Sequence, residues 1–290
     1  MNYRHAFHTG NFADVIKHAV LVRILLYLNV KPAAYRVIDT HAGAGLYDLA
    51  SDEARRGAEW QSGIGRVFAA QAAGDLPDAV VALLAPYLDA VRALNPADRL
   101  THYPGSPLLA RAIMRPQDRL VACELEPHAA AALARHLRDP RVKTLAIDGW
   151  TALTAYVPPT ERRGLVLVDP PFEQPDEFAR LAASAAEAHR KWATGCYVLW
   201  YPIKDRTGPD RLAKAMRRAG IGKALRAELV VSPPAATGPL AGSGLIVINP
   251  PWPLEAELKV MLPVLAQLLA REGTARGMWR LDWLTAETAN

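Results

Sequence analysis

An aspartate, two prolines and an aromatic residue follow an apolar run, in the order Leu165-Val-Leu-Val-Asp169-Pro170-Pro171-Phe172. The run predicts a buried strand that ends at the carboxyl edge of a sheet, where open α/β folds bind ligands. There, a carboxylate and the Pro170 carbonyl could accept both N–H bonds of an exocyclic purine amine, while Phe172 stacks on the base. The prolines fix φ and would keep that carbonyl directed inward. The motif predicts chemistry on a ring amine; a proline-terminated strand with a core phenylalanine is the alternative.

A glycine-containing loop, Asp39-Thr-His41-Ala-Gly43-Ala-Gly45, follows the β-rich run Tyr35–Asp39. Glycines at this place let the backbone turn tightly and approach a ligand closely. The loop therefore predicts one wall of a nucleotide-type site. The pattern is weak by itself, and a plain turn is the alternative interpretation.

Acidic residues end the next two predicted strands. Glu124 could hold ribose hydroxyls, although such a residue usually lies about 20 positions after the glycine loop. Glu124 lies 79 residues beyond Gly45, and excising residues 52–100 reduces this spacing to 30. Asp148-Gly149 ends a third strand, where the adenine of a cofactor would sit. A surface carboxylate and a simple turn are the respective alternatives.

The elements that position these residues alternate along the chain. Near-continuous apolar strands separated by helices indicate a mostly parallel sheet with helices on both faces, an α/β, Rossmann-like fold. The loop Ser232–Gly244 is too short for a helical crossover, so the last two strands should pair antiparallel at one edge of the sheet. Seven strands are predicted, at Tyr35–Asp39, Leu120–Cys123, Thr144–Ile147, Gly164–Val168, Cys196–Trp200, Ala227–Val231 and Leu245–Ile248. The helical patterns between them are Pro127–Leu137, Asp176–Arg190 and Asp210–Ala219.

Residues 52–100 have a different character. They contain the helical patterns Glu59–Gln71 and Pro77–Leu94, no convincing strand, and five basic against seven acidic residues. We expect a small helical subdomain inserted into a single α/β domain that consists of residues 1–51 and 101–290.

The positive charge is unevenly distributed. The net charge is +5, yet residues 190–228 carry +7 and residues 1–36 carry +4. A phosphate-facing surface and solvated helix faces both explain such segments. On the predicted helix 210–219, Arg211, Lys214 and Arg218 share one face, for which we favour phosphate contact.

The composition, 51% apolar and 22% charged, is that of a globular protein. Cys123 and Cys196 lie in apolar runs, which favours a reduced, cytoplasmic protein without disulfides. We expect a soluble chain, because no signal-peptide pattern and no apolar run of about 20 residues is seen. The spacing of the early histidines fits no zinc pattern, so no metal is expected.

Two candidate site residues, His18 and Ser106, also have purely structural interpretations. His18 would open an amphipathic helix, where a lone histidine is commonly structural. Ser106 precedes Pro107 and would serve as a normal helix N-cap.

Asp-Pro-Pro followed by Tyr or Phe is the signature of N6-adenine and N4-cytosine amino-methyltransferases. The whole pattern resembles the RlmJ family of large-subunit rRNA adenine-N6 methyltransferases. The segments that carry this resemblance flank residues 52–100 on both sides and are the N-terminal Tyr3-Arg4-His5-Ala-Phe7-His8-Thr-Gly10-Asn11-Phe-Ala13-Asp14-Val-Ile-Lys17-His18, the Asp39 loop, Tyr103-Pro-Gly-Ser-Pro107, Leu199-Trp-Tyr-Pro202 and Ile248-Asn-Pro-Pro-Trp252.

The resemblance implies a class I methyltransferase that uses S-adenosyl-L-methionine on 23S rRNA, without a metal. It makes Asp169 catalytic together with Pro170 and Phe172, and places Tyr3 and Lys17 at the RNA or the target pocket. Phe172 stands where related enzymes have Tyr, so the stacking face is kept and a hydroxyl is lost. We expect a monomer. The implied cofactor site comprises His18, His41, Gly43, Ser106, Glu124, Asp148, Gly149 and Asp169.

Two other functions stay open. A DNA adenine or cytosine amino-methyltransferase of the same fold usually needs a region that reads a duplex, and the near-neutral segment 52–100 offers no evident basic recognition helix. A catalytically silent nucleic-acid-binding protein with a vestigial cofactor fold is the other, although such a protein has no need of an intact Asp-Pro-Pro-Phe motif.

Overall fold

A computed structural model describes residues 5–96, 99–274 and 276–285. Its main element is an eight-stranded sheet with the spatial order β10 (Met278–Thr285), β8 (Ala224–Val230), β9 (Gly242–Ile248), β7 (Cys196–Ile203), β6 (Gly164–Val168), β1 (Arg36–Asp39), β4 (Arg119–Cys123) and β5 (Val142–Leu145). β1 pairs in parallel with both β4 and β6, β4 pairs in parallel with β5, and β6 pairs in parallel with β7. β9 lies antiparallel between β7 and β8, and β10 is antiparallel to β8.

The structure confirms the mostly parallel sheet and corrects its size from seven strands to eight. The missed strand β10 contains Arg280 and Asp282, which break the apolar pattern. Asp282 is paired with buried Arg226 of β8, with Nη2 and Oδ2 2.7 Å apart. The antiparallel pairing of β8 with β9 is confirmed, but the edge position is wrong, because β10 lies outside β8.

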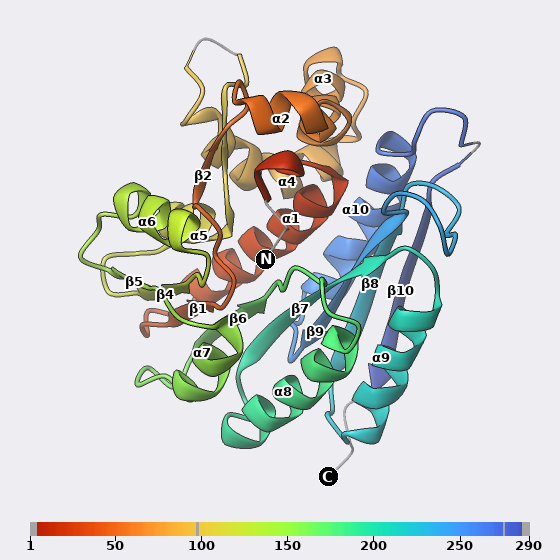
Figure 1. The fold of residues 1–290 in the computed structure, drawn as a ribbon. Coiled ribbons are helices and arrows are strands. Elements are labelled where there is room, and N and C mark those ends of the chain that lie inside the picture. The colour runs from red at the N-terminus through yellow and green to blue at the C-terminus, as the bar shows by residue number, and fades with distance from the viewer. Residues whose placement is uncertain (1–4, 97–98, 275, 286–290) are drawn as a thin grey trace.

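Helices cover both faces of the sheet, as predicted (Figure 1). One face packs against α1 (Phe12–Asn29), α5 (Ser106–Ile113) and α10 (Leu254–Leu268). The other packs against α7 (Gly149–Ala155), α8 (Glu177–Lys191) and α9 (Thr207–Arg218). A further helix, α6 (Pro127–His136), connects β4 to β5.

Helix α1 is the exception to the expected amphipathic pattern. Fourteen of its 18 residues are buried, because the sheet, the segment 52–100 and α10 enclose it. The helix also begins at Phe12, so His18 lies within it rather than at its start. Both parts of the sequence-based prediction for this helix were wrong.

Residues 52–100 are helical, as the sequence indicates: α2 (Asp52–Gly57), the π-helical turn η2 (Gln61–Gly65), α3 (Arg66–Ala73) and α4 (Asp78–Arg92). A two-stranded antiparallel sheet of β2 (Leu46–Asp48) and β3 (His102–Pro104), which the sequence did not predict, joins the two ends of this segment. Buried residues such as Leu84 share one core with α1 and α10. The division into two domains stays a prediction.

None of the helices in the described part of the chain has both the length and the apolarity that crossing a lipid bilayer requires. Cys123 and Cys196 are buried in β4 and β7 as free thiols.

Candidate active site

The carboxyl ends of β1, β4 and β6 border a cavity of about 560 Å³. The 3-10 turn η1 (His5–Phe7), α1, the loop after β1, β2, the start of α5 and α6 also contribute to its walls, so segments far apart in the chain meet here. Eight of the predicted site residues line the cavity, namely Lys17, His18, His41, Gly43, Ser106, Glu124, Asp169 and Pro170. Asp148, Gly149 and Phe172 lie outside its lining, and Tyr3 lies outside the described residues.

A buried ion-pair network connects α1 to the Asp-Pro-Pro motif. The Lys17 ammonium lies 2.5 Å from Asp169 Oδ2 and 2.8 Å from Asp14 Oδ1. Burial opposes the charge of Lys17, but these two carboxylates raise its pKa above the ordinary value. Burial likewise opposes ionisation of Asp14, yet His5 and Lys17 hold the pKa of that carboxyl well below its usual range. A cation therefore faces the Asp169 carboxylate at neutral pH.

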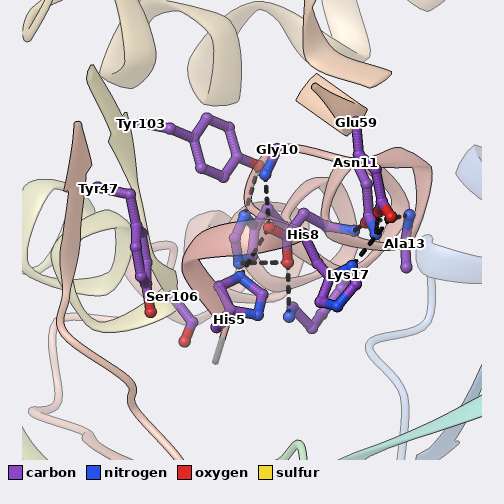
Figure 2. Close-up of polar contacts among 12 residues, drawn as sticks. His5, His8, Gly10, Asn11, Ala13, Lys17, Tyr47, Glu59, Tyr103 and Ser106 are labelled. Carbon is purple, nitrogen blue, oxygen red and sulfur yellow. Dashed lines mark hydrogen bonds and ion pairs between the residues drawn. The ribbon is translucent and has the colours of Figure 1, made fainter. Parts of the chain in front are cut away.

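The start of α1 is held in place by its own cap and by residue 59. Asn11 Oδ1 accepts hydrogen bonds from the backbone N–H groups of Ala13 and Asp14 at 2.9 and 3.0 Å. Asn11 Nδ2 in turn donates to Glu59 Oε2 at 2.8 Å (Figure 2). Asn11 and Asp14 were named from the sequence only within the N-terminal segment and neither was assigned a role, although a capping asparagine ahead of an apolar helix is a recognisable signal.

Ser106 and Asp39 form a second buried contact at the cavity. Ser106 Oγ donates to Asp39 Oδ2 at 2.6 Å, while Asp39 Oδ1 has no hydrogen-bond partner among the described residues. Burial raises the pKa of Asp39 to about 7; the Ser106 hydrogen bond opposes this rise and the charge of Asp169 adds to it. The N-cap interpretation of Ser106 is wrong, since Gly105 occupies the cap position and the hydroxyl is bound to Asp39. Sequence reasoning did not select Asp39, although it ends β1 just before the glycine loop.

Glu124 and the glycine loop meet as a nucleotide-type site requires. Gly43 N–H donates to Glu124 Oε2 at 2.9 Å, and Glu126 N–H donates to Oε1 at 2.8 Å. Gly43 has a φ of +60°, and a Cβ atom there would lie 2.1 Å from the Tyr47 hydroxyl. Only glycine fits this turn without strain, so the loop is specific for its residue type.

His41 connects the cavity with the third strand end. Its ring meets the edge of Trp150 at a centroid distance of 5.4 Å, and Gly149 packs so closely on it that a Cβ would lie 2.7 Å from Cε1. Burial lowers the pKa of His41 to about 3, so the ring is neutral. Asp148 caps α7 through the Trp150 N–H and pairs with Arg180 at 3.3 Å. Gly149 thus borders His41, and neither Gly149 nor Asp148 lines the cavity.

Phe172 belongs to an aromatic cluster. Its ring centroid lies 4.7 Å from that of Phe178 and 5.6 Å from that of Trp200. Its φ of +52° lies in the left-handed region, where a bulky residue is strained, and such strain is concentrated at functional sites. The structure keeps the ring partly exposed, and its stacking on a base stays a prediction.

The basic segment 190–228 divides into internal and surface charges. Arg226 is buried against Asp282, and Arg206 pairs with Glu228 at 2.8 Å. Those cations stabilise the sheet and the start of α9 rather than facing a ligand. The predicted face of α9 is exposed, with Arg211, Lys214 and Arg218 in solvent.

The polar groups around the cavity suit an amino-acid–nucleoside conjugate. Glu124 can accept from ribose hydroxyls and Lys17 brings positive charge. Asp39, which the cavity-lining Ser106 contacts, has a buried Oδ1 acceptor without a hydrogen-bond partner among the described residues. A cavity of about 560 Å³ is of the size that encloses such a ligand. No group of three or more histidine, cysteine or acidic side chains that could hold a metal is found among the described residues. Fold and site together define a class I methyltransferase, whose cofactor is S-adenosylmethionine.

Comparison with known proteins narrows this class to a family. Residues 32–285 match the family model described as "RsmJ: Ribosomal RNA large subunit methyltransferase D, RlmJ". The chain belongs to this family. It is similar to two proteins named ribosomal RNA large subunit methyltransferase J: that of Haemophilus influenzae, 39% identical over 99% of this chain and 100% of that protein, and that of Escherichia coli K12, 40% identical over the same shares. The crystal structure of protein LPL1258 from Legionella pneumophila matches with a TM-score of 0.85 and 33% identity, over 95% of this chain and 98% of that chain.

Proposed function

We propose that this protein methylates the N6 amine of an adenine in 23S rRNA. The observation that carries the proposal is the Asp169 carboxylate at the cavity, bound to the Lys17 ammonium at 2.5 Å and followed by two rigid prolines. The names of the two bacterial relatives support large-subunit rRNA as the substrate. We further propose that the protein acts in the cytoplasm as a monomer, with residues 52–100 as an inserted subdomain of the methyltransferase domain.

The reaction needs a better nucleophile than a ring-conjugated amine. When bound, S-adenosylmethionine supplies a methyl group made electrophilic by its sulfonium. Lys17 contacts Asp169 Oδ2, which leaves Oδ1 to accept one N–H of the amine, and the Pro170 carbonyl accepts the other. Both acceptors localise the nitrogen lone pair and aim it, and orientation of this kind lowers the barrier strongly. Asp169 is then the nearest base for the proton that the amine releases.

The remaining side chains divide along the length of the cofactor. We assign His18, His41, Gly43 and Ser106 to its amino-acid portion and Glu124 to the ribose hydroxyls. We place the adenine of the cofactor beside Asp148 and Gly149. Phe172 stacks on the target base, and Tyr3 contacts the RNA.

The direct test offers tritiated S-adenosylmethionine with deproteinised 23S rRNA or with duplex DNA. We expect label in rRNA and N6-methyladenine in its mass-spectrometric digest. Asp169→Ala should abolish transfer while calorimetry still detects cofactor binding. Label in DNA alone, or turnover by the variant, would contradict the proposal.

A further inference from the structure

A hydrogen-bonded chain of three buried rings connects the helical segment 52–100 to the cavity. The Tyr87 hydroxyl on α4 lies 2.7 Å from the Tyr103 hydroxyl on β3. The Tyr103 hydroxyl lies 2.8 Å from His18 Nδ1 on α1. All three side chains are at most 1% exposed, yet His18 also lines the cavity. These hydrogen-bonded rings therefore connect α4, which is remote from α1 in sequence, to a side chain that lines the cavity.

The protons along these hydrogen bonds can be ordered in two ways, with His18 Nδ1 either accepting or donating. If Tyr87 donates to Tyr103 and Tyr103 donates to His18 Nδ1, every hydroxyl proton has an acceptor. If His18 Nδ1 donates to Tyr103 instead, one of the two hydroxyl protons is left without an acceptor among the described residues. A buried donor without an acceptor costs about 1–3 kcal/mol. The hydroxyl protons therefore favour the first order, which places the imidazole proton on Nε2, 3.9 Å from Asp14 Oδ1.

The surroundings of the other ring nitrogen favour the same arrangement. His18 Nε2 lies 3.9 Å from Asp14 Oδ1, a carboxylate that is held ionised. Negative charge near that nitrogen favours an N–H bond over a lone pair. Burial also lowers the pKa of His18 to about 3, so only one ring nitrogen carries a proton.

We propose that Tyr87 and Tyr103 fix His18 as the neutral Nε2–H tautomer, so that the segment 52–100 contributes a positioning residue to the cofactor site. Nδ1 of His18 is held by the Tyr103 hydroxyl, which does not line the cavity, so Nε2 is the ring nitrogen left for a ligand. That edge offers a single N–H donor, which suits an acceptor such as the cofactor carboxylate. The identity of this ligand rests on the proposed function; the tautomer does not.

Nuclear magnetic resonance of the ¹⁵N-labelled free protein tests the tautomer directly. We expect the His18 signals of a protonated Nε2 and an unprotonated, hydrogen-bonded Nδ1, assigned by their loss in His18→Gln. Tyr103→Phe should shift both signals toward a tautomer mixture. Tyr87→Phe should change them less, because Tyr103 can still donate. Tyr27→Phe, the same change elsewhere on α1, should leave them unaltered. A protonated Nδ1 in the unchanged protein would overturn the inference.

Cofactor binding then tests whether the tautomer matters. Tyr103→Phe should weaken S-adenosylmethionine binding about tenfold, the effect of losing one oriented hydrogen bond, with kcat changed less than KM. His18→Gln, whose amide N–H₂ can take the place of Nε2–H, should bind better than His18→Asn. Equal binding by the four proteins would overturn the positioning role. If the unchanged protein binds no S-adenosylmethionine, the proposed function fails, and the resonance result still decides the tautomer.

Discussion

Lys17 Nζ lies 2.5 Å from Asp169 Oδ2, although 152 residues separate the two along the chain. Asp14, one turn before Lys17 on α1, contacts the same ammonium at 2.8 Å. The position of the carboxylate at the end of β6 therefore depends on the N-terminal helix. That helix depends in turn on the Asn11 cap and its contact with Glu59.

Replacing Lys17 by Met should damage both stability and activity. The change leaves Asp14 and Asp169 facing each other without the cation between them, and breaking a buried pair by removing one partner costs about 3–5 kcal/mol. Urea unfolding measures the loss of stability. In Asp14→Asn/Lys17→Met, stability should largely return, because one of the two facing negative charges is gone. Methyl transfer should stay low, because Asp169 still lacks its anchor. Full activity in the double variant would contradict a positioning role for Lys17.

Replacing Gly43 by Ala tests the fit of the glycine loop. The new Cβ would lie 2.1 Å from the Tyr47 hydroxyl at a φ of +60°. We expect cofactor binding to fall at least about tenfold, since strain and clash together exceed about 1.4 kcal/mol. Calorimetric titration with S-adenosylmethionine measures this.

Gly74→Ala is the matched control, because Gly74 has a φ of +75° with open space around it. It should lose similar backbone stability while binding the cofactor normally. In Gly43→Ala/Tyr47→Phe the clash with the hydroxyl is relieved and part of the affinity should return. Equal affinity in the two glycine variants would show that the loop does not shape the site.

The strand-end motifs were predictable because they depend on local patterns. An apolar run followed by Asp169 or by Glu124 indicates a strand that ends at the edge of a sheet, whatever the position of that strand in the sheet. The contacts of Lys17 with Asp169 and of Tyr87 with Tyr103 were not predictable. These partners lie 152 and 16 residues apart in sequence and meet only when the fold packs them together, which no local pattern encodes. β10 was missed because Arg280 and Asp282 break its apolar pattern, and Asp282 meets its buried partner Arg226 only when β8 lies beside it.

The buried Asp39 should make stability depend on pH. Its folded-state pKa of about 7 lies above the unfolded value near 3.9, so the folded protein binds the extra proton. The raised pKa of Asp39 therefore adds to the free energy of unfolding below about pH 4, and this contribution is lost progressively as the pH rises to about 7. Asp39→Asn stays neutral and should lack this loss.

Urea unfolding at pH 5 and pH 8 measures the difference. The free energy of unfolding of Asp39→Asn, taken relative to that of the unchanged protein, should be larger at pH 8 than at pH 5. Asp52→Asn, on the exposed start of α2, should keep the ordinary pH dependence. A pH dependence of Asp39→Asn equal to that of the unchanged protein would mean that Asp39 is ionised in the folded state at pH 5.

The exposed face of α9 tests which charges meet RNA. Arg211, Lys214 and Arg218 lie in solvent on one helix, whereas Arg206 and Arg226 are held by internal carboxylates. Replacing the three exposed cations by Ala should weaken binding of a 23S rRNA fragment and leave S-adenosylmethionine binding unchanged. Because each phosphate contact releases condensed counterions, the slope of log Kd against log salt should become shallower by up to about two or three.

A control removes two exposed cations elsewhere, Arg55 and Arg56 on α2 in the near-neutral segment 52–100. Filter binding across a salt series compares the variants. If α9 follows the RNA backbone, only its triple variant changes the salt slope, because general loss of positive charge lowers affinity without removing a specific phosphate contact. An unchanged slope in the α9 variant would assign these three cations to a solvated helix face.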